Sequence, residues 1–371
     1  MKKLGIISYN IYGNFTNYGS ALQSWALHQA IKRIGDYQPV LVDYCPDVLM
    51  DKDPLNPFKN MWDQDQESKR MCELTMPAIR VNYQKFEDFY RIRFYRTTKK
   101  YTSVTFNEIM EDEKLDGFVC GSDTIFCMDE FGFDDGFYAN YPCMHGKSVA
   151  YAASFGDPTL SEENCRILNE RLQNFKAFGL REEQMIQYVK NHTNVPVQRV
   201  IDPTLLLTSE DYDSIAVPNQ MNEKYLLLYS RRYSPKMEAY AEKIASEKGL
   251  KIVDISLRAT NAEKGHIMRY DAGVEEFLSL VKHADYVVTN SFHGMIFSVQ
   301  YRRPFVIFSR EQCNNKIAEI LDLFSLLDRM LITGNESFNE EINYNEVHKR
   351  INDARIKSIA FLKEELDVYL N

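Results

Sequence analysis

The strongest constraint on this chain is a repeated alternation of short apolar segments with helical segments. The apolar run 3–10 is followed by a helical segment from Ala21 to Gly35 and then by a second apolar run at 39–44. Strand–helix–strand units of this kind form parallel sheets, because parallel strands need a crossover connection. The alternation occurs in two series, one ending near residue 207 and one covering 224–335.

We therefore expect an α/β chain with two Rossmann-like domains, residues 1–207 and 224–335, joined by a polar linker. The length of 371 residues supports this, because domains typically hold about 100–200 residues. Residues 46–104 interrupt the alternation and are interpreted as a helical insertion, with a helix near 77–95. A last helical segment covers 340–371, and one place for it is against the first domain.

The charge balance restricts the class of ligand. Lys and Arg total 44 against 53 Asp and Glu, a net charge of −9. An acidic protein is a poor candidate for binding nucleic acid or an anionic membrane surface, so we expect neither. An anionic substrate would need basic residues gathered in one cleft.

Cysteine and histidine spacing argues against metal and disulfide sites. The seven cysteines are scattered without CxxC spacing, and the histidines lack metal-binding spacing. Reduced thiols are typical of the cytoplasm. No segment approaches the roughly 20 apolar residues of a membrane helix. We expect a cytoplasmic protein without an integral membrane segment, with peripheral attachment at the inner face of the membrane as an alternative.

Polar residues cluster where four predicted strands end, at 10–20, 121–123, 180–182 and 289–294. The carboxyl ends of parallel strands meet at one edge of a sheet, and ligands of open α/β sheets bind there. With two such domains, the cleft between them is the first place to look for a site.

The segment TNSFHG, residues 289–294, follows a predicted strand and opens a helix. Asn290 or Ser291 can cap that helix, which places His293 in its first turn. Free backbone N–H groups and the helix dipole attract phosphate or carboxylate there and lower the pKa of a histidine. His293 is therefore a candidate acid or base. The structural alternative is a capped helix whose histidine only packs.

Two further loops supply candidates in the first domain. Asn17, Tyr18 and Gly19 follow the first strand, where a glycine lets a ligand approach the backbone; an ordinary turn is the alternative. Ser122 and Asp123 follow another strand, and Asp123 can act as a base or accept a hydrogen bond from a sugar hydroxyl. Its alternative role is a capped turn.

Arginines end two of the predicted strands. Arg181 follows a strand that is expected to be buried, so it needs a partner: Glu182, Glu183, or the carboxylate or phosphate of a ligand. Arg231 raises the same question in the second domain, with a solvated loop as the alternative. Asp202 is interpreted as forming the turn that ends the first domain.

Several motifs, taken in order, resemble the polysaccharide pyruvyl transferase family over residues 3–330. They are NFTNYGSALQSWALHQAI, GSD, KSVAYAASFG, LREE, VIDPTLLL, NSFHG and RRPFVIF. The resemblance implies a GT-B-like fold in which two Rossmann-like domains face a cleft. It implies pyruvyl transfer from phosphoenolpyruvate to hydroxyls of a bacterial surface polysaccharide precursor, which forms a ketal and releases phosphate. The acceptor would be a glycan or a lipid-linked sugar, and no further cofactor is implied.

The resemblance also implies roles for single residues. His293 would be the acid or base beside the donor, Arg181 would clamp the donor's carboxylate or phosphate, and Asp123 would face the acceptor. The chain departs from the family at Ser291, where members often carry arginine.

Arg231, Arg310 or Lys316 could supply the positive charge that is missing at position 291. Two other functions stay open. One is a GT-B-like glycosyltransferase that uses a nucleotide sugar, and the other is a non-catalytic glycan-binding member of the family.

Overall fold

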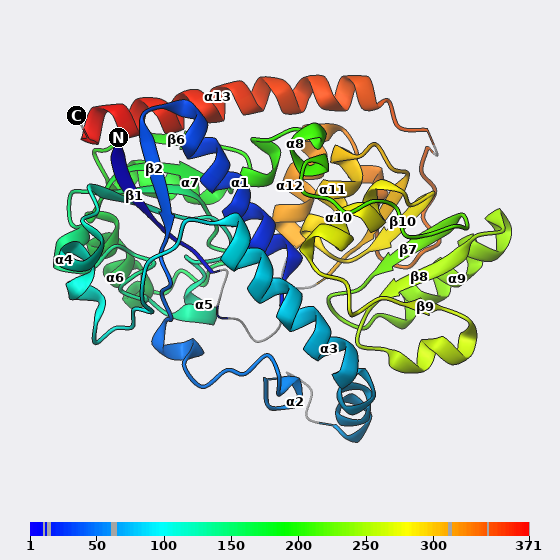
Figure 1. The fold of residues 1–371 in the computed structure, drawn as a ribbon. Coiled ribbons are helices and arrows are strands. Elements are labelled where there is room, and N and C mark those ends of the chain that lie inside the picture. The colour runs from blue at the N-terminus through cyan, green and yellow to red at the C-terminus, as the bar shows by residue number, and fades with distance from the viewer. Residues whose placement is uncertain (10–11, 13–15, 61–64, 311–313, 340, 371) are drawn as a thin grey trace.

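The computed structural model describes residues 1–9, 12, 16–60, 65–310, 314–339 and 341–370. It consists of two six-stranded parallel sheets with helices packed around them (Figure 1). The predicted α/β class with two parallel sheets and a C-terminal helix is confirmed. Residues 10, 11 and 13–15 of the first predicted polar cluster lie outside the described residues.

The first sheet has the spatial order β2-β1-β3-β4-β5-β6. Its strands are β1 (Lys2–Ile7), β2 (Tyr37–Leu41), β3 (Gly117–Cys120), β4 (Ser148–Ala153), β5 (Phe175–Leu180) and β6 (Val197–Arg199). Every residue of β3 and β4 is buried, as expected for parallel strands covered on both faces. The strand order reverses between β1 and β3, which makes this point the topological switch of the sheet.

The second sheet has the order β12-β11-β10-β7-β8-β9. Its strands are β7 (Tyr225–Tyr229), β8 (Lys251–Ile255), β9 (Ile267–Met268), β10 (Tyr286–Thr289), β11 (Phe305–Phe308) and β12 (Met330–Leu331). The order reverses between β7 and β10. Both switch points therefore lie in sheets of the same design, and the loops after their strands are the expected ligand-binding positions.

The helices of the first domain fill the connections between its strands. They are α1 (Tyr18–Ile34), α4 (Ile109–Glu113), α5 (Met128–Phe131), α6 (Glu162–Leu172) and α7 (Glu183–His192), while α8 (Ser209–Asp213) lies in the connection from β6 to β7. The second domain contains α9 (Pro235–Lys248), α10 (Val274–Lys282), α11 (Phe292–Gln300) and α12 (Asn314–Phe324). Among the described residues, no helix combines the length and apolar character needed to cross a membrane.

One apolar core runs through both domains. Helix α1 belongs to the first domain but contacts α10 and α11 of the second. Tyr18 at its start stacks on Phe277 of α10, with ring centroids 4.4 Å apart. Because α1 is covered on both sides, it is buried nearly all round, including the polar residues Ser20, Gln23, Ser24 and His28.

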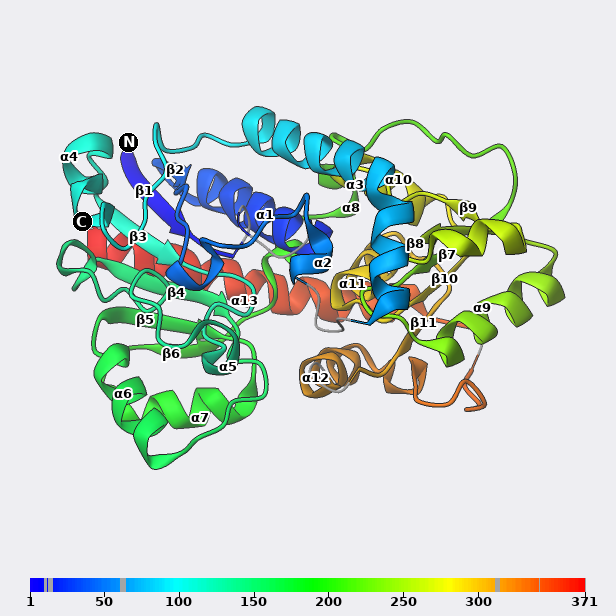
Figure 2. The same ribbon diagram turned by 90° about the horizontal axis from the view of Figure 1, so that it is seen from below.

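The predicted insertion forms α2 (Pro57–Asn60) and the long helix α3 (Gln66–Arg93). The prediction of a helix over 77–95 placed its start wrongly, because Pro77 was taken as the first helical residue. The helix instead runs through Pro77, and Figure 2 shows that α3 bends, as a helix with an internal proline does. Lys85 of α3 pairs with Glu276 of α10 at 2.7 Å, so α3 joins the two domains.

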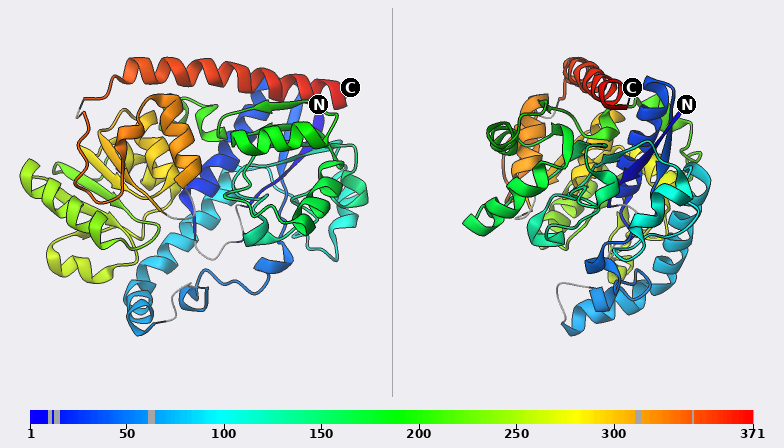
Figure 3. Two further views of the ribbon diagram at one scale, coloured as in Figure 1. Left: turned by 180° about the vertical axis from the view of Figure 1, so that it is seen from behind. Right: turned by 90° about the vertical axis from the view of Figure 1, so that its left-hand side faces the viewer.

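The C-terminal helix α13 (Tyr344–Leu370) lies along both domains (Figure 3). Arg355 donates to the backbone carbonyls of Leu205 and Leu207 at 2.7 and 3.0 Å. Ser358 accepts a hydrogen bond from the backbone N–H of Ile201 at 3.1 Å. Helix α13 therefore fixes the segment 201–207, which leaves the first sheet and leads to the second domain.

Phe361→Ala should destabilise the protein by about 3–5 kcal/mol, since it removes a large buried side chain from α13. Phe361 is 3% exposed and packs against Gly179 of β5. The matched control is Ile356→Ala on the same helix, where the side chain is 58% exposed and little should change. Urea denaturation measures both variants, and equal effects would contradict the role given to α13.

Candidate active site

The loops after the two switch points meet at the domain interface. Gly19, at the start of α1, lies against His293 of α11: a Cβ built on Gly19 would be only 1.9 Å from Nδ1 of the imidazole. Arg231, just after β7, donates from Nη1 to the backbone carbonyl of Thr16 at 3.2 Å. The fold thus brings together the predicted clusters after β1 and β10 and the predicted Arg231 after β7.

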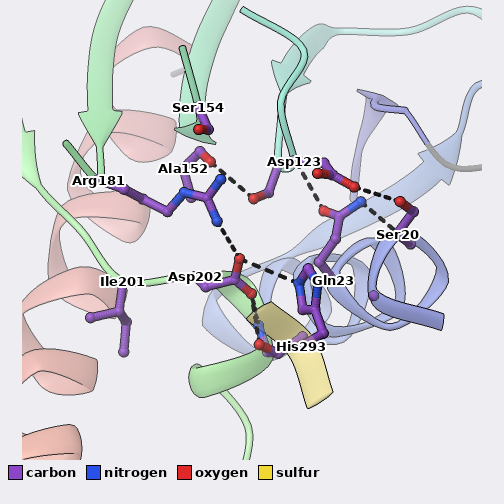
Figure 4. A network of polar contacts seen from close by, with 12 residues as sticks. Ser20, Gln23, Asp123, Ala152, Ser154, Arg181, Ile201, Asp202 and His293 are labelled. Atoms are coloured by element: carbon purple, nitrogen blue, oxygen red, sulfur yellow. Dashed lines mark hydrogen bonds and ion pairs between the residues drawn. The ribbon is translucent and has the colours of Figure 1, made fainter. Parts of the chain in front are cut away.

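A buried carboxylate lies at the centre of this region. Nη1 of Arg181 is 2.6 Å from Oδ2 of Asp202, and Nε2 of His293 is 3.7 Å from the same oxygen (Figure 4). Oδ1 of Asp202 accepts from the N–H and hydroxyl of Thr204 at 3.0 and 2.6 Å. Arg181 is therefore paired with Asp202, and not with the neighbouring Glu182 or Glu183.

Asp202 stays ionised although it is only 1% exposed. Burial by itself would raise the pKa of its carboxyl group. The neighbouring imidazole of His293, the Arg181 guanidinium and the Thr204 hydroxyl outweigh burial and hold the pKa below the ordinary 3.8. A permanent negative charge therefore faces His293.

His293 is placed by the start of α11. Ser291, and not Asn290, caps this helix by accepting from the Gly294 N–H at 3.2 Å. Asn290 instead accepts from the Arg231 N–H at 2.8 Å and donates to the Arg232 carbonyl at 2.7 Å, which ties down the loop after β7.

The two imidazole nitrogens of His293 have different surroundings. A carboxylate beside Nε2 favours a proton on that nitrogen and leaves the lone pair on Nδ1. At 3.7 Å the contact is longer than a hydrogen bond, so it acts through charge. Nδ1 packs against Gly19, whose missing side chain leaves room for the ring. The lone pair on Nδ1 is the position at which the neutral ring can take up a proton.

A second polar network surrounds Asp123 at the end of β3. Ser20 of α1 donates to Oδ2 of Asp123 at 2.5 Å, and the Thr124 N–H donates to Oδ1 at 2.9 Å. Gln23 of α1 accepts from the Ser122 N–H at 3.0 Å, and the Ser122 hydroxyl donates to a carbonyl of β4. The Asp123 carboxylate is held rigidly, while Ser122 is part of the scaffold.

Glu130 of α5 is a further acidic group of the cleft. The Thr124 hydroxyl donates to it at 3.4 Å. The surrounding protein removes water from this carboxylate, and Asp123 adds negative charge; together they raise its pKa to about 7 against the opposing charges of Lys316 and Arg231. Glu130 can therefore give or take a proton near neutral pH.

Cationic groups from both domains complete the surroundings. The centroid of the Phe292 ring is 5.6 Å from the guanidinium carbon of Arg181 and 5.8 Å from the ammonium nitrogen of Lys316. Arg231 carries its charge near Asp123. Arg310 follows β11, and its N–H donates to Asn314 at 2.7 Å. The acidic chain thus concentrates positive charge where its two domains meet.

Some sequence-predicted residues support the site without pointing free polar atoms into it. Asn17 caps α1 by accepting from the Gly19 N–H at 3.0 Å. The Tyr18 hydroxyl donates to the carbonyl of Ala272 at 2.7 Å inside the shared core. Their polar atoms, like those of Ser122, Asn290 and Ser291, are engaged in protein contacts.

Sequence reasoning missed four residues of the site: Ser20, Gln23, Glu130 and Asp202. The turn predicted at Asp202 is present, but the same carboxylate also binds Arg181.

Within the described ranges, no group of three or more His, Cys, Asp or Glu side chains could hold a metal ion.

The loops after the two switch points meet at the domain interface, with His293 against Gly19 and Arg231 against Thr16. A sequence model of the family described as polysaccharide pyruvyl transferase matches residues 17–312. This chain belongs to that family. A comparison with curated proteins found no match.

Solved structures show the fold. A structure described as a UDP-N-acetylglucosamine 2-epimerase from Listeria monocytogenes matches with a TM-score of 0.51 and 12% identity, over 98% of this chain and 91% of that one. The ADP-heptose lps heptosyltransferase II of E. coli has a TM-score of 0.37 and 11% identity, over 96% of this chain and 99% of that one. The expected GT-B fold is confirmed, and at these identities only the fold is shown.

Asp202→Asn should lower the free energy of unfolding at pH 7 by about 3 kcal/mol, because it leaves buried Arg181 without its counter-charge. The folded-state pKa of Asp202 lies below its ordinary 3.8, so its stabilisation is complete above pH 4 and is lost as the pH falls further. The difference in the free energy of unfolding between wild type and variant should therefore become smaller between pH 4 and pH 3. Urea denaturation across this range tests the prediction.

The control for Asp202→Asn is Asp213→Asn, which removes a half-exposed partner of Lys282 and should cost less than about 1 kcal/mol. If the loss of unfolding free energy in Asp202→Asn does not change with pH, Asp202 is not ionised in its pair with Arg181.

Gly19→Ala should destabilise the protein by about 1–3 kcal/mol, because the added methyl group collides with the His293 imidazole. In a His293→Ala background the same substitution should cost almost nothing, since the collision partner is gone. A double-mutant cycle followed by thermal unfolding measures this coupling. Equal costs in both backgrounds would show that the two residues do not touch.

Proposed function

We propose that this protein transfers the pyruvyl group of phosphoenolpyruvate to hydroxyls of a sugar in a polysaccharide precursor, forming a pyruvate ketal and releasing phosphate. The observation that carries the proposal is the Asp202–His293 pair beside Arg181 at the interface of a pyruvyl transferase family member. His293, with Asp202 beside it, can give or take a proton, and Arg181 supplies a positive charge for an anionic donor.

The reaction needs proton transfers at four positions: C3, the two hydroxyls and the phosphate. In the first step, a sugar hydroxyl oxygen bonds to C2 of the enol while C3 receives a proton and becomes a methyl group. In the second step, another hydroxyl of the sugar bonds to C2, and the C2–O bond to phosphate breaks. Each hydroxyl loses its proton, and the leaving phosphate takes one up.

His293 suits the first proton transfer. When both nitrogens of the ring carry protons, the proton on Nδ1 can pass to C3 while Nε2 faces Asp202. The neutral imidazole that results can then remove the proton of the second hydroxyl. One histidine acts first as acid and then as base, and its starting state is restored.

Asp123 and Glu130 suit the acceptor side. One of the two carboxylates accepts the proton of the first hydroxyl and later gives it to the leaving phosphate. Glu130, with a pKa near 7, can do both at neutral pH, while Asp123 is held by Ser20 to accept a hydrogen bond from the sugar.

The donor's charge requires cations. Arg181 and Lys316 both lie within 6 Å of the ring of Phe292, the residue before His293, and Arg231 and Arg310 come from neighbouring loops of the second domain. These four side chains are the proposed partners of the donor's carboxylate and phosphate, in place of a cation at position 291.

Isothermal titration calorimetry with phosphoenolpyruvate tests the proposal without knowledge of the acceptor. The wild-type protein should bind it, and Arg181→Ala should weaken binding by roughly tenfold or more, the effect of losing one charge-assisted hydrogen bond. Arg166→Ala, an exposed arginine of α6, is the matched control and should bind as the wild type does.

Two results of this titration would contradict the proposal. Binding of a nucleotide sugar without binding of phosphoenolpyruvate would favour a glycosyltransferase. Failure of the wild type to bind either donor would favour a non-catalytic glycan-binding protein.

A further inference from the structure

A groove lies away from the candidate active site, where α8 and α10 are next to each other (Figures 1 and 2). It has a volume of about 390 Å³ and is open to solvent. Pockets that hold small molecules are typically of this size. The described residues that line it include none of those that the proposed reaction uses. We call it the α8 groove.

The α8 groove is at the other end of the second sheet from His293. Helix α11 has His293 in its first turn and ends at Gln300, which lines the groove. These residues are seven positions apart, so they are separated by about 10 Å along the helix axis. Arg302 and Arg303 of the lining come before β11, whereas the loops of the candidate active site follow their strands. A ligand in the groove therefore occupies a place separate from the donor's.

Positive charge predominates in the α8 groove. Its lining contains three cations, Lys282, Arg302 and Arg303, and one carboxylate, Asp213. The carboxylate is already paired with Lys282 at 2.8 Å. With His283 counted as neutral, the lining has an excess of two positive charges, although the whole chain has a net charge of −9. Basic residues gathered in a concave surface attract anions.

The two arginines make hydrogen bonds to neutral groups. Nη1 of Arg302 donates to the side-chain oxygen of Asn345 at 3.2 Å, and Nε of Arg303 donates to the backbone carbonyl of Tyr301 at 2.9 Å. Among the described lining residues, the ion pair is the one between Lys282 and Asp213. An arginine held through Nε can still offer both of its Nη groups to phosphate oxygens.

Stabilisation of helix ends explains only part of this arrangement. Lys282 lies in the last turn of α10, and Arg302 and Arg303 follow α11, where cations interact favourably with the negative end of a helix. That effect requires each charge to lie near its own helix. It does not require cations from two helices to line one cavity, which a site for an anion does.

We propose that the α8 groove binds a small molecule that carries a phosphate or diphosphate group. Arg302 and Arg303 bind the phosphate oxygens, and Lys282 adds positive charge beside them. The groove holds on the order of ten water-sized groups, more than one phosphate group fills. The rest of the ligand lies against Ser209 and Asn219, which offer a hydroxyl and an amide. This second site goes beyond the proposed pyruvyl transfer and does not depend on it.

Isothermal titration calorimetry with inorganic pyrophosphate tests the site. The wild type should bind it, and Arg303→Ala and Arg302→Ala should each weaken binding by roughly tenfold or more, the effect of losing one charge-assisted hydrogen bond. Arg302 is exposed, so this variant should fold even if Arg303→Ala does not. Asp213→Asn should instead bind pyrophosphate about threefold more tightly, because it removes the negative charge of the lining. A loss of folding cannot produce such a gain.

The matched control is Arg166→Ala, a substitution at an exposed arginine of α6, which should bind pyrophosphate as the wild type does. Arg181→Ala, which disrupts the proposed donor site, should keep pyrophosphate binding at the groove. Absence of binding to the wild type, or binding that the three groove variants leave unchanged, would overturn the site. Loss of pyrophosphate binding in Arg181→Ala alone would also overturn it, because the anion would then occupy the donor site. None of these outcomes requires phosphoenolpyruvate to bind, so failure of the proposed function is a separate result.

Discussion

The arrangement of the site depends on one buried charge, the carboxylate of Asp202. It binds Arg181 at the end of β5 and faces His293 on α11, so it connects the two domains at the place where their loops meet. An isolated buried carboxylate would be protonated or destabilising; these partners keep it ionised. Its charge favours a proton on Nε2 of His293, the ring nitrogen that lies 3.7 Å from it.

The rest of the fold keeps this carboxylate in place. Gln300 of α11 donates to the carbonyls of Thr204 and Leu207, which ties the histidine's helix to the segment that carries Asp202. Helix α13 holds the same segment from the other side through Arg355. The long helices α3 and α13 both contact the two domains, as the views in Figures 1 and 2 show. The domain interface is thus part of the site's construction.

Local sequence patterns predicted the two sheets, the loops after their strands, and His293 and Arg181 as notable polar residues. Such patterns work because strand ends and helix caps are determined by neighbouring residues. Partners that lie far apart in the sequence could not be found this way: Asp202 is 21 residues from Arg181 and meets it only because β5 and the chain after β6 end at one edge. Glu130 follows no strand, and its raised pKa arises from Asp123 and from the surrounding protein. The predicted start of α3 was wrong because the low helix propensity of proline cannot show that packing continues the helix through Pro77.

The most direct test of the account is the protonation of the His293 ring. Long-range proton–nitrogen NMR spectra of the ¹⁵N-histidine-labelled protein distinguish the two neutral tautomers, and the His293→Gln spectrum assigns the signal. The account predicts a proton on Nε2 and a lone pair on Nδ1 in the wild type at high pH, with this preference lost in Asp202→Asn. A proton on Nδ1 in the wild type, or an unchanged tautomer in the variant, would show that Asp202 does not orient the histidine.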